Sequence, residues 1–164
     1  VEVLHQQVGQ RGFLRFFQSI QKKLLLFVQI CINSKTGVYG RTRAAFSGPE
    51  LEMAFAQEVV PGDAEIWTTV DGEVPKAYRI RIEKVNDADP HRNMILRVTD
   101  RQLLAKTGGI VQGMSGSPIL QNGRLVGAVT HVLVNDPTRG YGIFAQTMLK
   151  QARAVEKTDD AAQP

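Results

Sequence analysis

The residues best suited to covalent chemistry are six in a row, Gly113-Met114-Ser115-Gly116-Ser117-Pro118. A serine hydroxyl acts as a nucleophile when it is exposed and when backbone N–H groups point to where the oxyanion of the tetrahedral intermediate develops. Glycines on both sides of Ser115 let the chain turn sharply without Cβ clashes. We therefore expect Ser115 to be a nucleophile and the amides of Gly113 and Ser115 to form its oxyanion hole.

The same six residues also fit an ordinary glycine-rich turn, so the flanking sequence decides between the two interpretations. The nucleophile elbow of α/β-hydrolases has the form Gly-x-Ser-x-Gly and leads into a helix. Here, Pro118 to Gln121 and Arg124 to Val134 have the pattern of two strands joined by the tight turn Asn122-Gly123. A strand after Gly-x-Ser-Gly-x-Pro is typical of the nucleophile loop of trypsin-like barrels.

The elements that must position this loop are short strands separated by turn residues. Alternating apolar residues or strong β-formers predict strands over 64–70, 78–85, 93–99, 118–121 and 124–134, the last ended by Asn135-Asp136-Pro137. Residues 101–106 have the pattern of one helical turn. Phe144, Met148, Ala152 and Val155 recur at helical spacing. We predict a mainly β protein, an antiparallel barrel or sandwich with a C-terminal α-helix.

Length and composition indicate one globular domain without a cofactor. The 164 residues suit a single core, and we divide them into an N-terminal segment (1–28) that is either helical or disordered, a folded part (29–156) and a disordered tail (157–164). Cys31 is the only cysteine, which excludes an intrachain disulfide, and one cysteine with three scattered histidines makes no plausible zinc site. The net charge of +4 comes largely from the first 43 residues; with no nucleic-acid motif beside it, we interpret this as a solvated basic segment and expect no nucleic-acid partner.

Longer stretches of the chain carry a family resemblance. They are Asn33 to Gly40, Ala64 to Gly72, Thr107 to Ile119, Gln121-Asn122-Gly123, Val126 to Val132, Val134 to Pro137 and Gly140-Tyr141-Gly142. From about Gln29 to about Leu149 the sequence resembles the stage IV sporulation protein B peptidase family. The resemblance implies a trypsin-like antiparallel β-barrel, here one half of a double barrel, and a serine endopeptidase. It also implies an extracytoplasmic place between the two membranes around the forespore, and a membrane-associated signalling protein as substrate in the pathway that activates a late sigma factor.

By this resemblance, Ser115 matches the family's nucleophile and Asp100 the acidic member of its triad. A carboxylate that leaves a strand can reach a histidine N–H and hold its tautomer. Asp100 also precedes the helical segment that begins at Arg101, and aspartate is a good helix N-cap. From the residues alone, both roles stay open.

The catalytic histidine is where the sequence departs from the family. The family has it in a Gly-His-Gly motif upstream of the serine, and here the histidines are His5, His91 and His131, none in such a motif. A serine without a base is a weak nucleophile at neutral pH. We therefore expect a C-terminal part of the peptidase domain, with little activity alone and with the other half of the domain as its partner. The alternative is a non-catalytic barrel that binds a peptide or a protein.

Of the three histidines, we expect His5 and His91 to be solvated, whereas His131 lies 16 residues after Ser115 on a predicted strand. In trypsin-like barrels this strand borders the pocket for the residue before the cleaved bond. Glutamate-specific peptidases of that fold have a histidine at a comparable place. We hypothesise that His131 lines the pocket and favours an acidic or polar side chain; the alternative is a buried, hydrogen-bonded structural histidine.

Overall fold

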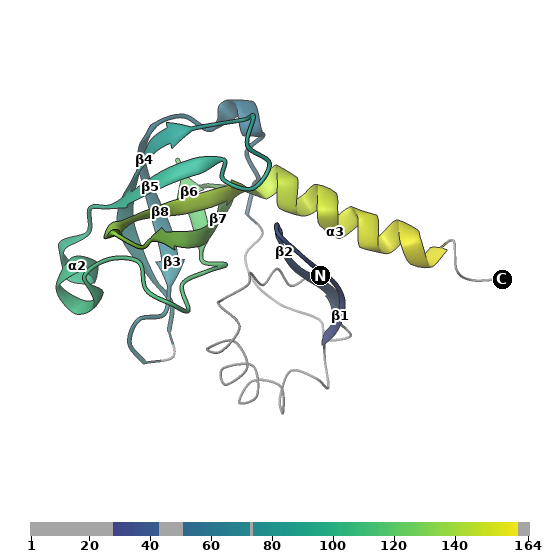
Figure 1. Cartoon of the computed structure of the whole chain (residues 1–164), viewed down its shortest axis with the longest axis horizontal. Helices are drawn as coiled ribbons and strands as arrows, with labels where there is room; N and C mark the ends of the chain where they lie inside the picture. Colours follow the sequence, from purple (N-terminus) through teal and green to yellow (C-terminus); the bar gives the residue numbers. More distant parts are fainter. Residues whose placement is uncertain (1–27, 43–50, 73, 161–164) are drawn as a thin grey trace.

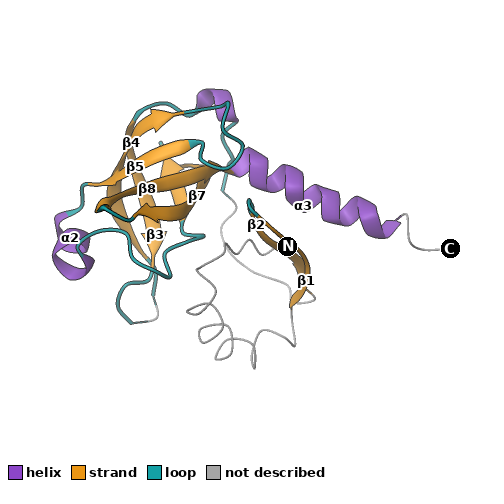
Figure 2. Cartoon of the chain, in the orientation of Figure 1, coloured by secondary structure: helices purple, strands orange, loops and turns teal. Residues whose placement is uncertain are grey.

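The centre of the molecule is a closed antiparallel barrel, in which six strands follow one another in the order β3-β4-β5-β8-β7-β6 (Figure 1). The computed structural model describes residues 28–42, 51–72 and 74–160, so the predicted helical spacing upstream and His5 lie outside the described residues. A mainly β fold with an antiparallel barrel and a C-terminal helix is confirmed (Figure 2).

The described part of the chain contains short strands that pair in antiparallel fashion, and three helices. The strands are β1 (Val28–Ser34), β2 (Gly37–Thr42), β3 (Gly62–Thr68), β4 (Lys76–Val85), β5 (Met94–Val98), β6 (Pro118–Gln121), β7 (Arg124–Leu133) and β8 (Asp136–Phe144). The helices are η1 (Ala56–Glu58), α2 (Arg101–Thr107) and α3 (Ala145–Asp160). None of these described helices is long and apolar enough to span a bilayer.

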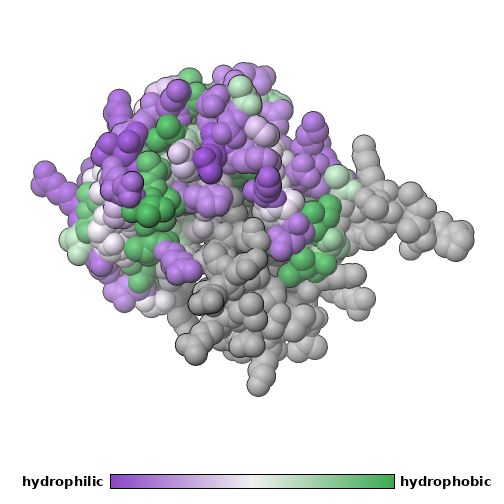
Figure 3. All heavy atoms as spheres, in the orientation of Figure 1, coloured by the Kyte–Doolittle hydropathy of each residue, from purple (hydrophilic) through white to green (hydrophobic). Residues whose placement is uncertain are grey.

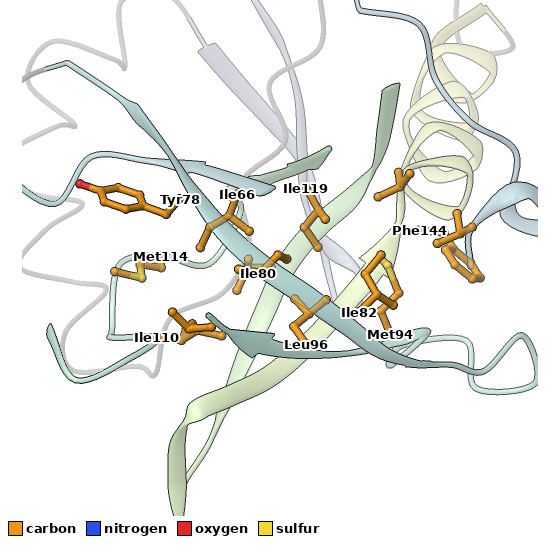
Figure 4. Close-up of a cluster of buried hydrophobic side chains, with 14 of the residues drawn as sticks. Ile66, Tyr78, Ile80, Ile82, Met94, Leu96, Ile110, Met114, Ile119 and Phe144 are labelled. Carbon is orange, nitrogen blue, oxygen red and sulfur yellow. The ribbon is translucent and has the colours of Figure 1, made fainter. Parts of the chain in front are cut away.

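Side chains along β4 alternate between the inside of the barrel and its outer surface. Tyr78, Ile80 and Ile82 are at most 4% exposed and point into the barrel, whereas Arg79 and Arg81 point outward. Burying each such side chain contributes roughly 1.5–3 kcal/mol. The core that they join also contains Ile66, Met94, Leu96, Ile110, Met114, Ile119 and Phe144 (Figure 4). Hydrophilic side chains cover much of the outer surface in the view of Figure 3.

The strand β8 is an element that the sequence did not predict. The strand predicted over 124–134 ends at Leu133, and Val134 and Asn135 form the turn. Asp136 and Pro137 already belong to β8, which pairs with both β7 and β5. The glycines of β8 weaken the strand pattern in the sequence, because glycine has low β-propensity. Close packing requires them: a Cβ on Gly140 would lie 2.5 Å from the His131 carbonyl oxygen, and one on Gly142 would lie 2.9 Å from Ile119 Cδ1.

A second, smaller core joins the β1–β2 hairpin to α3. Tyr39 on β2 is 2% exposed and clusters with Met148 and Ala152 of α3, together with Ala128 and Ile143 of the barrel. The helix α3 therefore contacts both β2 of the hairpin and the barrel strands β7 and β8, and it extends outward from the barrel (Figure 1).

Replacing Gly127 by alanine tests the tight packing of β7 on β8. The new Cβ would lie 2.0 Å from the backbone oxygen of Ile143, which cannot move without breaking the β7–β8 ladder. We expect Gly127→Ala to lower the free energy of unfolding by about 3 kcal/mol. The matched control is Gly72→Ala in an open turn, where only the left-handed backbone (φ +70°) is strained and the loss should be about 1 kcal/mol. Equal losses in urea denaturation would contradict this account of the packing.

Candidate active site

The loop that carries Ser115 is a hydrogen-bonded extension of β6 along β7. Gly116 N–H donates to the Val129 carbonyl (2.8 Å), and Val129 N–H donates to the Ser117 carbonyl (2.9 Å). Gly113 (φ +105°) and Gly116 (φ +90°) have left-handed backbone conformations that L side chains rarely adopt. The two glycines that flank Ser115 are thus required by the turn itself, as the sequence indicated.

The other end of the loop is fixed on the start of β8. Ile110 N–H donates to the Pro137 carbonyl (2.7 Å), and Gly109 lies so close to Pro137 that a Cβ would come within 2.1 Å of the same oxygen. The Ile110 and Met114 side chains are buried in the barrel core (Figure 4). Because Met114 fills the core, the chain presents the next residue, Ser115, as a half-buried side chain at the barrel surface.

The backbone amides around Ser115 differ in whether they are hydrogen-bonded. Turns within the loop engage the amides of Met114, which donates to Val111 O (3.1 Å), and of Ser117, which donates to Met114 O (3.0 Å). For the amides of Gly113 and Ser115, the described part of the chain contains no acceptor. They are the two N–H groups expected to form the oxyanion hole, and they are available to bind a developing negative charge.

Within the described residues, the Ser115 hydroxyl is bonded to a backbone carbonyl and not to a base. Its Oγ donates to the Thr130 carbonyl on β7 at 2.7 Å. A neutral carbonyl oxygen orients the hydroxyl but does not accept its proton, so this contact by itself does not make the serine nucleophilic. The Thr130 side chain is 1% exposed, and its Oγ1 has no partner among the described residues. No sequence pattern points to Thr130, because a backbone carbonyl can be contributed by any residue type.

Asp100 has the helix-capping role that the sequence left open. Its Oδ1 accepts hydrogen bonds from the amides of Gln102 (2.9 Å) and Leu103 (3.1 Å) at the start of α2, and its Oδ2 accepts one from the amide of Arg79 (3.3 Å). Burial raises the pKa of Asp100, but these amides and the Arg79 charge outweigh burial, and the pKa lies below its usual range. Both carboxylate oxygens have backbone partners and none is a histidine, so the triad role stays a prediction.

Neither of the two described histidines is hydrogen-bonded to Ser115. His131 is exposed on β7, unlike the buried structural histidine of the alternative; desolvation, and then the nearby Arg92 charge, lower its pKa. His91 is half-buried rather than solvated, and its Nδ1 is enclosed without a partner among the described residues. Over the same residues, no group of His, Cys, Asp and Glu could hold a metal ion.

Comparisons with known proteins fit this geometry. The family model described as SpoIVB peptidase S55 matches residues 2–149. No curated protein matches the sequence significantly. An inactive form of Rv3671c from M. tuberculosis superposes with a TM-score of 0.57 at 19% identity, covering 84% of this chain and 67% of that one. The active form of the Rv3671c protease gives a TM-score of 0.58 at 18% identity, covering 79% and 59%. The structural likeness establishes a shared fold.

Replacing Asp100 by alanine measures the cap and its pH dependence. At pH 7 we expect the free energy of unfolding to fall by about 1 kcal/mol. The pKa of Asp100 is lower in the folded protein than in the unfolded chain, where it is about 3.9, so the stabilisation is present above that value and is lost as the pH falls through the folded pKa. The difference between wild type and Asp100→Ala should therefore be constant above about pH 5 and shrink below pH 4.

The control for this measurement is Asp87→Ala, which removes an exposed loop carboxylate. Its stability should stay close to that of the wild type throughout the titration. A difference between wild type and Asp100→Ala that is unchanged from pH 7 to pH 2 would contradict the capping role.

Proposed function

The chain belongs to the SpoIVB peptidase S55 family of serine peptidases, and from that premise we propose that it carries the nucleophile-bearing part of an endopeptidase active site. The observation that carries the proposal is the loop around Ser115. Its hydroxyl lies at the barrel surface beside two amides, those of Gly113 and Ser115, that have no acceptor among the described residues. Oxygen attack on a peptide carbonyl needs these two features together, since each oxyanion donor lowers the barrier by about 3 kcal/mol.

The proton of Ser115 must leave before or during attack, and the proposal assigns its acceptor to a histidine outside the described residues. Thr130 O holds the hydroxyl hydrogen in the structure. A change of the Ser115 χ1 rotamer is enough to turn that hydrogen toward an incoming imidazole. The peptidase activity thus depends on a segment or a second polypeptide that adds this base against the β7 side of the loop.

The substrate has a natural place along β7. β6 pairs with β7 from Arg124 to Ala128, whereas β7 continues to Leu133 with β8 on its other side. The edge of β7 beyond Ser115 is therefore not covered by β6, and an extended peptide can add to it as a further strand. A peptide bound in this way would place one of its carbonyl groups next to Ser115.

Family membership also supports a proposal about the substrate and about where it is cleaved. The substrate would be a membrane-associated protein in the pathway that activates a late sigma factor during sporulation, and cleavage would take place outside the cytoplasm, between the membranes around the forespore. These assignments rest on family membership alone.

A second function is favoured by one contact. Because the Ser115 hydroxyl donates to Thr130 O and not to a base, the barrel as described is also suited to bind a peptide along β7 without cleaving it. The two functions differ in whether Ser115 ever becomes a nucleophile, which a chemical probe can measure.

Labelling with a fluorophosphonate probe distinguishes the two. We expect this chain alone to react at least about 10³-fold more slowly than a chain extended upstream to include a Gly-His-Gly segment, because the base is then present. Ser115→Ala should abolish labelling in the extended chain. Ser117→Ala, on the same loop, is the matched control and should retain it.

Each other outcome has a definite meaning. Absence of labelling in both chains would reject the peptidase and favour the peptide-binding barrel. Fast labelling of the shorter chain, abolished by Ser115→Ala, would reject the external base and assign that role to His91 or His131.

A further inference from the structure

A group of polar side chains lies one residue beyond the point where β7 holds the nucleophile. His131 on β7 is paired with Tyr141 on β8, which is paired in turn with Ile95 on β5. The residues next to them along the strands, Thr130 on β7, Gly142 on β8 and Met94 on β5, are buried. Since side chains alternate between the two faces of a sheet, His131 and Tyr141 lie side by side on the outer face.

Arg92 adds a cation to this group. Its guanidinium carbon lies 4.9 Å from the centroid of the Tyr141 ring, the geometry of a cation–π contact. Stacking on a ring holds the planar guanidinium in place while leaving its N–H groups free to donate. The Arg92 charge also acts on His131, where it lowers the pKa of the imidazole. Arg92 and His131 therefore border the same patch of surface around Tyr141.

The charge of Arg92 is not neutralised by a salt bridge. Among the described residues, several outward arginines reach a carboxylate within salt-bridge distance: Arg79, Arg81, Arg97, Arg124 and Arg139. Arg92 reaches none of the described ones. The Arg92 charge helps to lower the pKa of Asp89, but Asp89 Oδ1 accepts the amides of His91 (2.9 Å) and Arg92 (3.0 Å) and not the guanidinium. The guanidinium is left exposed and able to bind an anion from outside.

The position of His131, Tyr141 and Arg92 relative to Ser115 indicates which anion they can bind. Thr130, whose carbonyl accepts the Ser115 hydroxyl, directly precedes His131, and one residue along a strand is about 3.3 Å. A peptide that lies along the open edge of β7 with a carbonyl at Ser115 can therefore extend a neighbouring side chain toward His131 and, across it, toward Arg92 and Tyr141.

We propose that Arg92, stacked on Tyr141, and His131 form a subsite that binds an acidic side chain of the substrate peptide within a few residues of the scissile bond. The proposal rests on the proposed function, because it takes the peptide to lie along β7. Arg92 supplies the charge and a forked pair of donors for the carboxylate. The neutral imidazole of His131 supplies one further N–H donor.

The test is peptide binding, measured by fluorescence anisotropy on this chain. The probes are fluorescein-labelled ten-residue peptides of alanine and glycine with one glutamate, moved position by position, and their glutamine counterparts. We expect the best glutamate peptide to bind about tenfold tighter than its glutamine counterpart at low salt, and the preference to fall steeply in 0.5 M NaCl. Arg92→Gln should abolish the preference, and His131→Gln should reduce it.

The matched control is Arg81→Gln, which removes the same charge from the outer face of β4, where Arg81 contacts Asp63. It should leave the glutamate preference intact. Thermal unfolding of each variant verifies that the barrel is folded; if Arg92→Gln is unfolded, Arg92→Lys, which keeps the charge without the planar stack, should still weaken the preference.

The outcomes separate this subsite from the proposed peptidase function. Equal binding of glutamate and glutamine peptides, or binding of neither, would overturn the subsite. Serine labelling that depends on Ser115 would leave the peptidase standing in that case. A glutamate preference that Arg92→Gln removes, in a protein whose Ser115 never labels, would support the subsite and overturn the peptidase.

Discussion

The geometry of the site depends on one pair of backbone hydrogen bonds, from Gly116 N–H to Val129 O and from Val129 N–H to Ser117 O. They fix the loop to β7 immediately after Ser115. With the loop fixed there and Met114 buried in the core, Ser115 has only the barrel surface left to occupy. The Thr130 carbonyl that holds its hydroxyl belongs to the residue after Val129, so the same pairing sets the direction of the nucleophile. A shift of register between loop and strand would move all of these groups at once.

The close approach of β8 to its neighbours supports that pairing from the other side. Gly140 and Gly142 let β8 lie against the His131 carbonyl and the Ile119 side chain. A bulge in the β7–β8 ladder falls between Val129 and His131, and it leaves Thr130 out of the regular pairing. Bulges re-aim side chains and backbone groups next to active sites. Here the bulge accounts for Val129 pointing into the core while the next two residues serve the nucleophile and the outer surface.

The sequence predicted those features whose cause is local. The glycines of the Ser115 loop predict left-handed backbone, the alternation of Tyr78, Ile80 and Ile82 predicts an inward-facing strand, and Asp100 before Arg101 predicts a helix cap. The features that it missed arise from contacts between distant segments. β8 lacks the composition of a strand because its glycines satisfy packing against β6 and β7, not β-propensity. The stack of Arg92 on Tyr141 joins residues 49 positions apart, and no local pattern indicates it.

Capping and catalysis make different demands on Asp100, and the structure shows how far they conflict. Three amides already satisfy the carboxylate, and they lower its pKa, so it stays ionised at neutral pH. An ionised carboxylate is what a triad histidine requires, yet an oxygen that accepts one amide has a second lone pair available. Oδ2 accepts one long bond of 3.3 Å from the Arg79 amide and lies 3.9 Å from Arg79 Nε, whereas Oδ1 accepts both amides that cap α2. If a histidine is added against β7, it is Oδ2 that can accept its N–H without uncapping α2. The helix cap would then hold the carboxylate in position and so support the triad role.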